Sequence, residues 1–244
     1  SLSLSLSLSL SLRDSLCVFL AGLQAKWEAI RDEAVGPLVG EGGGGSSSAW
    51  ALEAERLHEA GRWSQLQLWR FGERIEEGCA QAPVTCALID RLDSARMVTG
   101  HSVGLVEFSR LAPGTVIKPH TAPDNTRIRA HLGLVAPPAK ESLFRASHLP
   151  LICQSSDKET DWFEQVTPEG AGIRVGSQSL GWVAGELLVF DDSFEHEVWH
   201  RGTEDRIVLI VPAPAKQCPP SLSRAPSVRV CVCVCVCVCA CVCV

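Results

Sequence analysis

The sequence lacks any apolar stretch long enough to cross a membrane as a helix. The longest apolar run near its start, Leu16–Leu23, is far shorter than the ~20 residues that a bilayer requires. The sequence also lacks a basic stripe, since 28 acidic residues outnumber 22 basic ones and the formal net charge is −6. These absences predict a chain without a membrane span, and they count against nucleic acid as a partner.

Both ends of the chain lack varied sequence and consist of two-residue repeats. Residues 1–12 alternate Ser and Leu, and residues 230–244 alternate Val and Cys except at Ala240. A CT dinucleotide repeat encodes alternating Leu and Ser in any frame, and a GT repeat encodes alternating Val and Cys. We therefore interpret both ends as translated microsatellite sequence. The Val-Cys run favours aggregation over a tetrahedral metal site, because all its thiols would lie on one face of a strand.

Between the repeats, ~200 residues remain, which is enough to bury one sizeable core. We expect a low-complexity Ser-Leu repeat at 1–12 and a helical N-terminal segment with a Gly/Ser linker at 13–60. The main domain is expected at 61–216, with an insertion at about 139–170. A disordered tail that carries the Val-Cys repeat is expected at 217–244.

The cysteine count does not indicate a redox compartment, because seven of the twelve cysteines belong to the Val-Cys repeat. Cys79 and Cys86 flank a turn that contains proline, and they would form a disulfide in a lumenal protein. Two reduced, buried thiols fit the sequence equally well. The compartment therefore stays open between the cytoplasm and a lumenal, membrane-associated location in the endoplasmic reticulum.

Hydrophobic periodicity predicts helices in the first part of the chain and short strands in the rest. The expected helices lie at 24–40, 49–60, 73–81 and 82–91. The expected strands lie at 61–69, 104–111, 116–120, 128–135, 172–176, 178–182, 187–190, 197–200 and 206–211. The last two strands are expected to pair across the turn 201–205. This pattern predicts an α+β, mainly β fold: a double-stranded β-helix (cupin or jelly-roll) core with N-terminal helices packed on it.

Two polar, histidine-bearing turns each lead into an apolar strand. His120 and His196 are 196 − 120 = 76 residues apart, as expected when metal ligands come from opposite strands of a barrel. Imidazole suits Fe(II), and two histidines leave positions open for a co-substrate and O2. Arg206 is the one charge that opens an otherwise apolar strand, where its planar fork would match a carboxylate.

These residues also have purely structural explanations. A histidine before a turn is most often a surface or satisfied core group, and Arg206 would be a solvating charge at a strand end. His131 on its apolar strand would be structural, and Asp191 and Asp192 would cap the turn before His196. Spacing alone therefore supports a metal site only weakly and indicates no substrate.

Two longer motifs strengthen the metal-site interpretation. One is His120-Thr-x-Pro-x-Asn-x-Arg-x-Arg-x-His-Leu-Gly-Leu, and the other is Phe190-Asp-Asp-Ser-Phe-Glu-His-Glu-Val-Trp. Upstream stands Phe108-Ser-x-Leu-x-Pro-Gly-Thr. Together they resemble the aspartyl/asparaginyl β-hydroxylase family of Fe(II)/2-oxoglutarate-dependent dioxygenases. The resemblance covers about residues 60–138 and 171–211.

The resemblance implies that His120 and His196 are the iron ligands. Many oxygenases carry a carboxylate ligand two residues after the first histidine, and here that position is Ala122. The family that the chain resembles has a small residue there and uses two histidines alone. The missing carboxylate is therefore consistent with an active member.

The resemblance also assigns the residues that would hold the co-substrate. Arg206 would clamp the C5 carboxylate of 2-oxoglutarate, helped by Ser109. Arg129 and His131 would line the pocket near the metal-chelating end. His120, His196 and Arg206 would thus be the catalytic residues.

The implied reaction hydroxylates the β-carbon of Asp or Asn in a peptide or protein substrate. It requires Fe(II) as cofactor and uses O2 and 2-oxoglutarate, which is decarboxylated to succinate. The chain departs from the family at the 139–170 insertion and after Val211, where Pro-Ala-Pro-Ala follows. Two alternatives stay open: a related 2-oxoglutarate oxygenase with another substrate, and a non-catalytic cupin-like binding module or pseudoenzyme.

Overall fold

The computed structural model describes residues 19–39, 50–53, 57–91, 104–122, 127–137, 170–214 and 228–231. The Ser-Leu repeat, the Gly/Ser linker, nearly all of the expected insertion and nearly all of the Val-Cys repeat lie outside these residues. The bounds of the expected domains therefore stay predictions.

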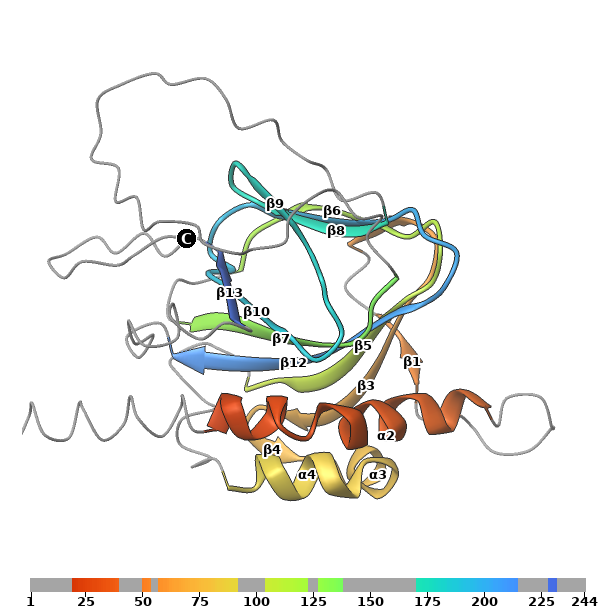
Figure 1. Ribbon diagram of the computed structural model, residues 1–244, viewed down its shortest axis with the longest axis vertical. Helices are drawn as coiled ribbons and strands as arrows, with labels where there is room; N and C mark the ends of the chain where they lie inside the picture. Colours follow the sequence, from red (N-terminus) through yellow and green to blue (C-terminus); the bar gives the residue numbers. More distant parts are fainter. Residues whose placement is uncertain are drawn as a thin grey trace, which may run out of the picture.

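Two β-sheets form the body of the described structure, one above the other in Figure 1. The strands of the larger sheet are β1 (Ala51–Leu52), β3 (Trp63–Arg70), β4 (Glu73–Arg74), β5 (Val106–Leu111), β7 (Arg127–Val135), β10 (Leu187–Phe190), β12 (Arg206–Pro214) and β13 (Val228–Cys231). Those of the smaller sheet are β2 (His58–Ala60), β6 (Val116–His120), β8 (Ala171–Val175), β9 (Gln178–Gly181) and β11 (His196–His200).

Strands that follow each other in the sequence often lie in different sheets. The larger sheet runs β1-β3-β5-β12-β7-β10-β13, with β4 paired to β3, and the smaller runs β2-β6-β11-β8-β9. The pairs are antiparallel except for β10 with β13. The expected fold class, mainly β with a cupin-like, two-sheet core and packed helices, is confirmed.

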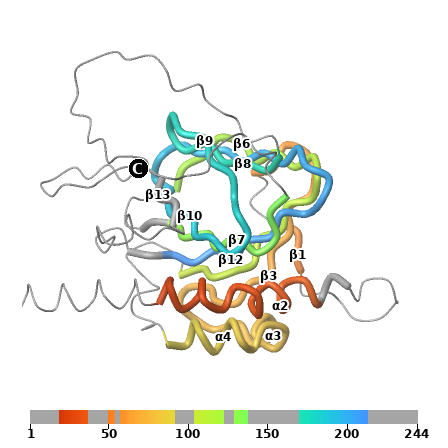
Figure 2. Tube along the Cα trace, in the orientation of Figure 1, coloured from red at the N-terminus to blue at the C-terminus, as the bar shows by residue number. Residues whose placement is uncertain are grey.

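Helices cover the outer face of the larger sheet, as both views show (Figures 1 and 2). They comprise residues 19–24, α2 (Trp27–Val39), α3 (Glu76–Gln81) and α4 (Pro83–Ile89). The Glu33 carboxylate of α2 accepts hydrogen bonds from the first backbone N–H groups of α4, at Val84 (2.6 Å) and Thr85 (2.8 Å). This contact supplies the N-terminal cap that α4 lacks in its own sequence.

A disulfide between Cys79 and Cys86 joins α3 to α4, with their Cα atoms 5.6 Å apart. Both cysteines are buried against the larger sheet. The structure thus decides between the two states that the sequence left open. Among the described helices, none is long and apolar enough to span a membrane.

The larger sheet is buried on both faces, and β12 shows the consequence most clearly. Its alternate residues Ile207, Leu209 and Val211 pack in the core under the helices. Val208 and Ile210 point the other way, into the core between the sheets. By the same two-residue period, Arg206 faces the space between the sheets, where a charge is costly.

The expected helix at 49–60 is wrong. Within that range, Ala51–Leu52 forms β1 against β3, and His58–Ala60 forms β2 against β6. The segment is rich in Ala, Glu and Leu, which favour helix, but pairing with neighbouring strands overrides this weak preference. The helix expected at 82–91 is confirmed as α4. The one expected at 24–40 begins only at Trp27, after a turn at 25–26, and the one expected at 73–81 begins only at Glu76.

The expected hairpin of residues 197–200 with 206–211 is also wrong. Strand β11 pairs with β6 and β8, whereas β12 pairs with β5 and β7 in the other sheet. The turn between them crosses from one sheet to the other and is held by His200. Its Nε2 donates to the carbonyl of Glu204 (2.6 Å), and its Nδ1 accepts from the N–H of Gly202 (3.2 Å).

The close approach of Gly133 to the segment before β10 generates a stability prediction. A Cβ atom at Gly133 would overlap the carbonyl oxygen of Val183, so the backbone would have to move. We expect Gly133→Ala to lower the free energy of unfolding by about 1–3 kcal/mol.

Gly22→Ala is the matched control, because it adds the same methyl group where no atom lies within 4 Å, in the helix at 19–24. Better helix propensity should stabilise this variant by about 0.5–1 kcal/mol. Urea unfolding of both variants checks the contrast. Equal stability changes would contradict the tight packing of β7 against this segment.

Candidate metal and co-substrate site

His120 and His196 lie directly opposite each other across the β6–β11 ladder. Their ring centroids are 4.1 Å apart. Between this pair and the next, Ile117 with Val198, β6 contains one more residue than β11. Pro119 lies in this bulge, where its missing N–H costs little, and the bulge sets the direction in which His120 leaves the strand.

The two imidazoles are held in the same way. The Nδ1 of His120 is 2.7 Å from the carbonyl oxygen of Lys118, and the Nδ1 of His196 is 2.9 Å from that of Phe194. A carbonyl only accepts, so each Nδ1 must carry the proton and donate it. In the neutral rings, both Nε2 atoms therefore keep a lone pair for a metal ion.

The electrostatics of His196 favour the neutral ring that a metal requires. Desolvation by burial lowers the pKa of His196 to about 4, and the hydrogen bond to the Phe194 carbonyl opposes this only in part. The imidazole is therefore uncharged near neutral pH.

The turn before β11 ties the two histidine-bearing segments together. The Asp191 carboxylate accepts from the backbone N–H (2.9 Å) and hydroxyl (2.6 Å) of Ser193, as expected for a turn cap. The carbonyl of Asp192 accepts from the N–H of Ala122 (2.7 Å). The Asp192 carboxylate, for which a capping role was also expected, forms an ion pair with Arg129 at 2.9 Å.

Arg206 is a buried cation without a carboxylate partner in the described part of the chain. It is 2% exposed. Its Nη1 donates a long hydrogen bond to the Ser109 carbonyl (3.4 Å), and no described acceptor lies within reach of its Nε. Burial lowers the pKa of Arg206 to about 9, so the guanidinium is still charged near neutral pH. A ligand carboxylate would provide the missing partner.

His131 and Ser109 lie on the same inner surface of the larger sheet. The indole N–H of Trp182 donates to His131 Nδ1 at 3.3 Å, and that of Trp63 donates to Ser109 Oγ at 3.0 Å. Desolvation, followed by the charges of Arg206 and Arg129, lowers the pKa of His131 well below its ordinary value. His131 is therefore a neutral ring.

Sequence reasoning missed the aromatic residues of this surface. Phe190 makes edge contacts with both His131 (centroids 5.0 Å apart) and His196 (5.4 Å), and thus joins the two parts of the site. Trp182 and Trp63 each donate a hydrogen bond into it. Trp182 and Trp63 look like ordinary core residues in the sequence, and Phe190 opens the second motif without a role being assigned to it.

The residues present fit a metal ion and a dicarboxylate. Two imidazoles whose Nδ1 atoms bond to backbone carbonyls, which leaves their Nε2 atoms free, are suitable for Fe(II). Within the described residues, no group of three or more His, Cys, Asp or Glu side chains is arranged to hold a metal, so this site would rest on the histidine pair. Arg206 supplies the charge that a second carboxylate would need.

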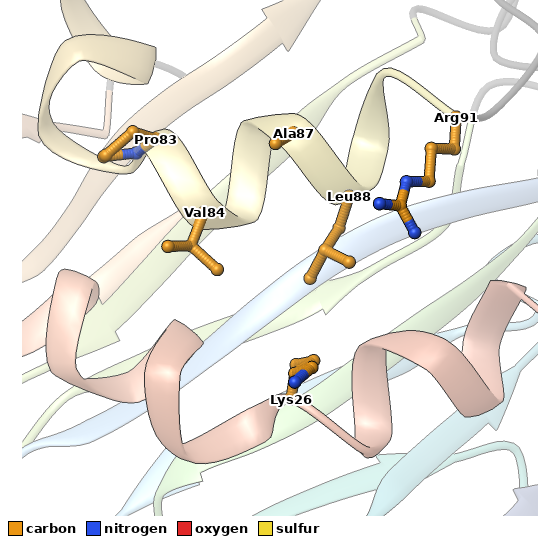
Figure 3. Close-up of a pocket in the computed structure, with 6 residues that line it drawn as sticks. All are labelled: Lys26, Pro83, Val84, Ala87, Leu88 and Arg91. Carbon is orange, nitrogen blue, oxygen red and sulfur yellow. The ribbon is translucent and has the colours of Figure 1, made fainter.

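A groove on the helix layer is separate from this site. It has a volume of about 390 Å³ and lies along α4, facing Lys26 (Figure 3). It is lined by Lys26, Pro83, Val84, Ala87, Leu88 and Arg91. None of the predicted site residues contributes to it.

Comparisons with known proteins agree with the two motifs. The family profile described as Aspartyl/Asparaginyl beta-hydroxylase matches residues 24–214. The aspartyl/asparaginyl beta-hydroxylase of Mus musculus is 36% identical over 189 residues, which cover 78% of this chain and 20% of that protein. The ornithine lipid ester-linked acyl 2-hydroxylase of Rhizobium tropici is 28% identical over 150 residues, covering 62% of this chain and 41% of that protein.

A solved structure of a predicted oxalate decarboxylase from Thermotoga maritima superposes with a TM-score of 0.36 and 11% identity, covering 68% of this chain and 91% of that chain. The chain spans about a fifth of the length of its mouse relative. The family profile, in contrast, matches the chain from Gln24, three residues before α2, to Pro214 at the end of β12, and this range includes the site. The chain therefore belongs to the aspartyl/asparaginyl beta-hydroxylase family.

Proposed function

We propose that the chain is an Fe(II)/2-oxoglutarate-dependent dioxygenase that hydroxylates the β-carbon of Asp or Asn in a peptide or protein. The observation that carries this proposal is the combination of two facing histidines with a buried Arg206 that has no carboxylate partner among the described residues. A purely structural barrel would gain nothing from an uncompensated cation in its core. Family membership supports the same reaction class.

His120 and His196 would hold Fe(II) through their Nε2 atoms. Each ring is fixed by its hydrogen bond to a backbone carbonyl, so little reorganisation is required when the metal binds. When bound there, Fe(II) would supply O2 activation and C–H oxidation, with 2-oxoglutarate as the source of two electrons. The chain itself supplies orientation and binding.

Arg206 would pair with the C5 carboxylate of 2-oxoglutarate, and Ser109 would assist it. Arg129 and His131 would line the other end of the co-substrate. Phe190, in contact with both His131 and His196, would keep water from the space between them. Arg129 is itself oriented by its ion pair with Asp192.

Lipids are a second substrate class within this family. The Rhizobium tropici relative is named for the hydroxylation of an ester-linked acyl chain of a lipid, so family membership alone does not select peptides. The higher identity to the mouse aspartyl/asparaginyl beta-hydroxylase, 36% against 28%, favours the peptide substrate. A panel of Asp- and Asn-containing peptides and ornithine lipids, analysed by mass spectrometry for a 16 Da gain, separates the two.

The histidine pair generates a metal-binding prediction. His120→Ala and His196→Ala should each weaken binding of Mn(II), used as a stable substitute for Fe(II), by about a hundredfold or more, since half of the protein ligands is lost. Isothermal titration calorimetry measures this. His58→Ala is the matched control, because His58 lies on the edge strand β2 and should leave the affinity unchanged. Wild-type affinity in both site variants would refute the metal assignment.

Replacing Arg206 should weaken the binding of 2-oxoglutarate without lowering the stability of the fold. Arg206→Met keeps the volume of the side chain but removes the charge, so 2-oxoglutarate should bind about ten- to a hundredfold more weakly. The melting temperature should stay the same or rise, because a desolvated cation is removed from the core. Arg31→Ala, at an arginine on α2 that pairs with Asp32, should change neither property.

Calorimetric titration with 2-oxoglutarate in the presence of Mn(II), together with thermal unfolding, tests both expectations. If Arg206→Met bound 2-oxoglutarate as tightly as the wild type, the clamp would be assigned to the wrong residue.

A further inference from the structure

Trp182 lies between the two groups assigned to opposite ends of the co-substrate. It directly follows β9 and begins the segment 182–186 that crosses from the smaller sheet to β10 in the larger one. The side chain is 4% exposed. No polar pattern in the sequence marks it, and it is not among the residues proposed to bind the metal or 2-oxoglutarate.

The segment that carries Trp182 is fixed to the body of the protein. Gly185 donates its N–H to the Gly133 carbonyl (2.9 Å), and Gly133 donates in return to the Glu186 carbonyl (2.9 Å). The side-chain amide of Gln24 reaches across from the helix layer to the Gly185 carbonyl (2.8 Å). Trp182 is therefore presented from a rigid segment.

The first contact of Trp182 determines the tautomer of His131. Indole nitrogen is only a donor, so its N–H···Nδ1 hydrogen bond requires that His131 Nδ1 be the acceptor. The proton of the neutral imidazole must then be on Nε2. The two rings are also nearly parallel, with an interplanar angle of 14° and centroids 6.2 Å apart.

The second contact holds Arg206. Its guanidinium carbon lies 4.4 Å from the centroid of the Trp182 ring. The face of an indole attracts a cation without neutralising it, unlike a carboxylate. Arg206 is thereby oriented while its charge remains available for an incoming anion.

We propose that Trp182 is a positioning residue for the co-substrate, because it fixes the donor tautomer of His131 and holds the Arg206 guanidinium ready for a carboxylate. The proposal rests on the function proposed above. Trp182 itself need not touch 2-oxoglutarate. If Trp182 merely filled the core, replacing it would lower the stability of the fold. The tautomer of His131 and the affinity for 2-oxoglutarate would stay unchanged.

Two substitutions separate the two contacts of Trp182. Trp182→Phe keeps an aromatic face for Arg206 but removes the N–H that His131 requires. Trp182→Leu removes both contacts. Trp199→Phe is the matched control. Trp199 is also a buried tryptophan with an arginine over its ring, Arg201 at 6.0 Å, but this ring packs over Gly172 in the smaller sheet.

The first measurement is calorimetric titration of the full chain with 2-oxoglutarate in the presence of Mn(II). We expect Trp182→Leu to raise the dissociation constant by about tenfold or more, because the cation–π contact and the hydrogen bond are both lost. Trp182→Phe should give a smaller rise, and Trp199→Phe should stay within about twofold of wild type. Thermal unfolding confirms that each variant is folded. Wild-type affinity in folded Trp182→Leu would overturn the proposal.

The second measurement needs no ligand. Long-range ¹H–¹⁵N NMR of histidine-labelled protein reports which ring nitrogen of His131 carries the proton. We expect the Nε2–H tautomer in the wild type and in Trp199→Phe, and a loss of that preference in Trp182→Phe. An Nδ1–H tautomer in the wild type, or an unchanged tautomer in Trp182→Phe, would contradict the inference.

The two measurements also distinguish the two proposals. A wild type that does not bind 2-oxoglutarate at all would refute the proposed function, and the NMR result would then decide alone whether Trp182 sets the tautomer of His131. A wild type that binds 2-oxoglutarate, with unchanged affinity and tautomer in the Trp182 variants, would refute the role of Trp182 only.

Discussion

The antiparallel pairing of β6 with β11 is the constraint on which the rest of the site depends. It places His120 opposite His196, although the two residues lie 196 − 120 = 76 positions apart in the chain. The bulge at Pro119 and the hydrogen bonds to the backbone carbonyls of Lys118 and Phe194 then fix the two rings. A slip of one residue in this register would turn one imidazole to the opposite face of the sheet and separate the pair.

The burial of Arg206 shows where the fold gives up stability for function. The larger sheet is covered by helices on one face and by the smaller sheet on the other, so its inner side chains are removed from water. A cation at such a position costs free energy unless an anion joins it. The contacts with the Trp182 ring and the Ser109 carbonyl reduce that cost without neutralising the charge. The site is therefore prepared for a carboxylate.

Part of this arrangement could be predicted from the sequence, because periodicity and polar exceptions are local signals. The apolar run at 207–211 indicated a strand, and the single charge that opens it indicated Arg206. The two motifs indicated His120 and His196. The helix expected at 49–60 failed because its Ala- and Glu-rich composition favours helix, while strand pairing decides the structure. The expected hairpin failed because a short turn usually joins paired strands, whereas here the turn crosses between sheets.

The aromatic part of the site was beyond sequence reasoning. Trp182 and Trp63 are the kind of residue expected in any core, and Phe190 was noted only as the start of a motif. The roles of all three follow from which rings meet across strands that are distant in the sequence. The ion pair of Asp192 with Arg129 was missed for the same reason, since a carboxylate in a turn is most simply explained as a cap.

The production of succinate from 2-oxoglutarate by the purified chain with added Fe(II) and O2 tests the central claim most directly. The account predicts measurable turnover by the wild type and none by His196→Ala, with both proteins folded. Equal rates in the two, or no turnover by a folded wild type across the panel of Asp- and Asn-containing peptides and lipids, would contradict it.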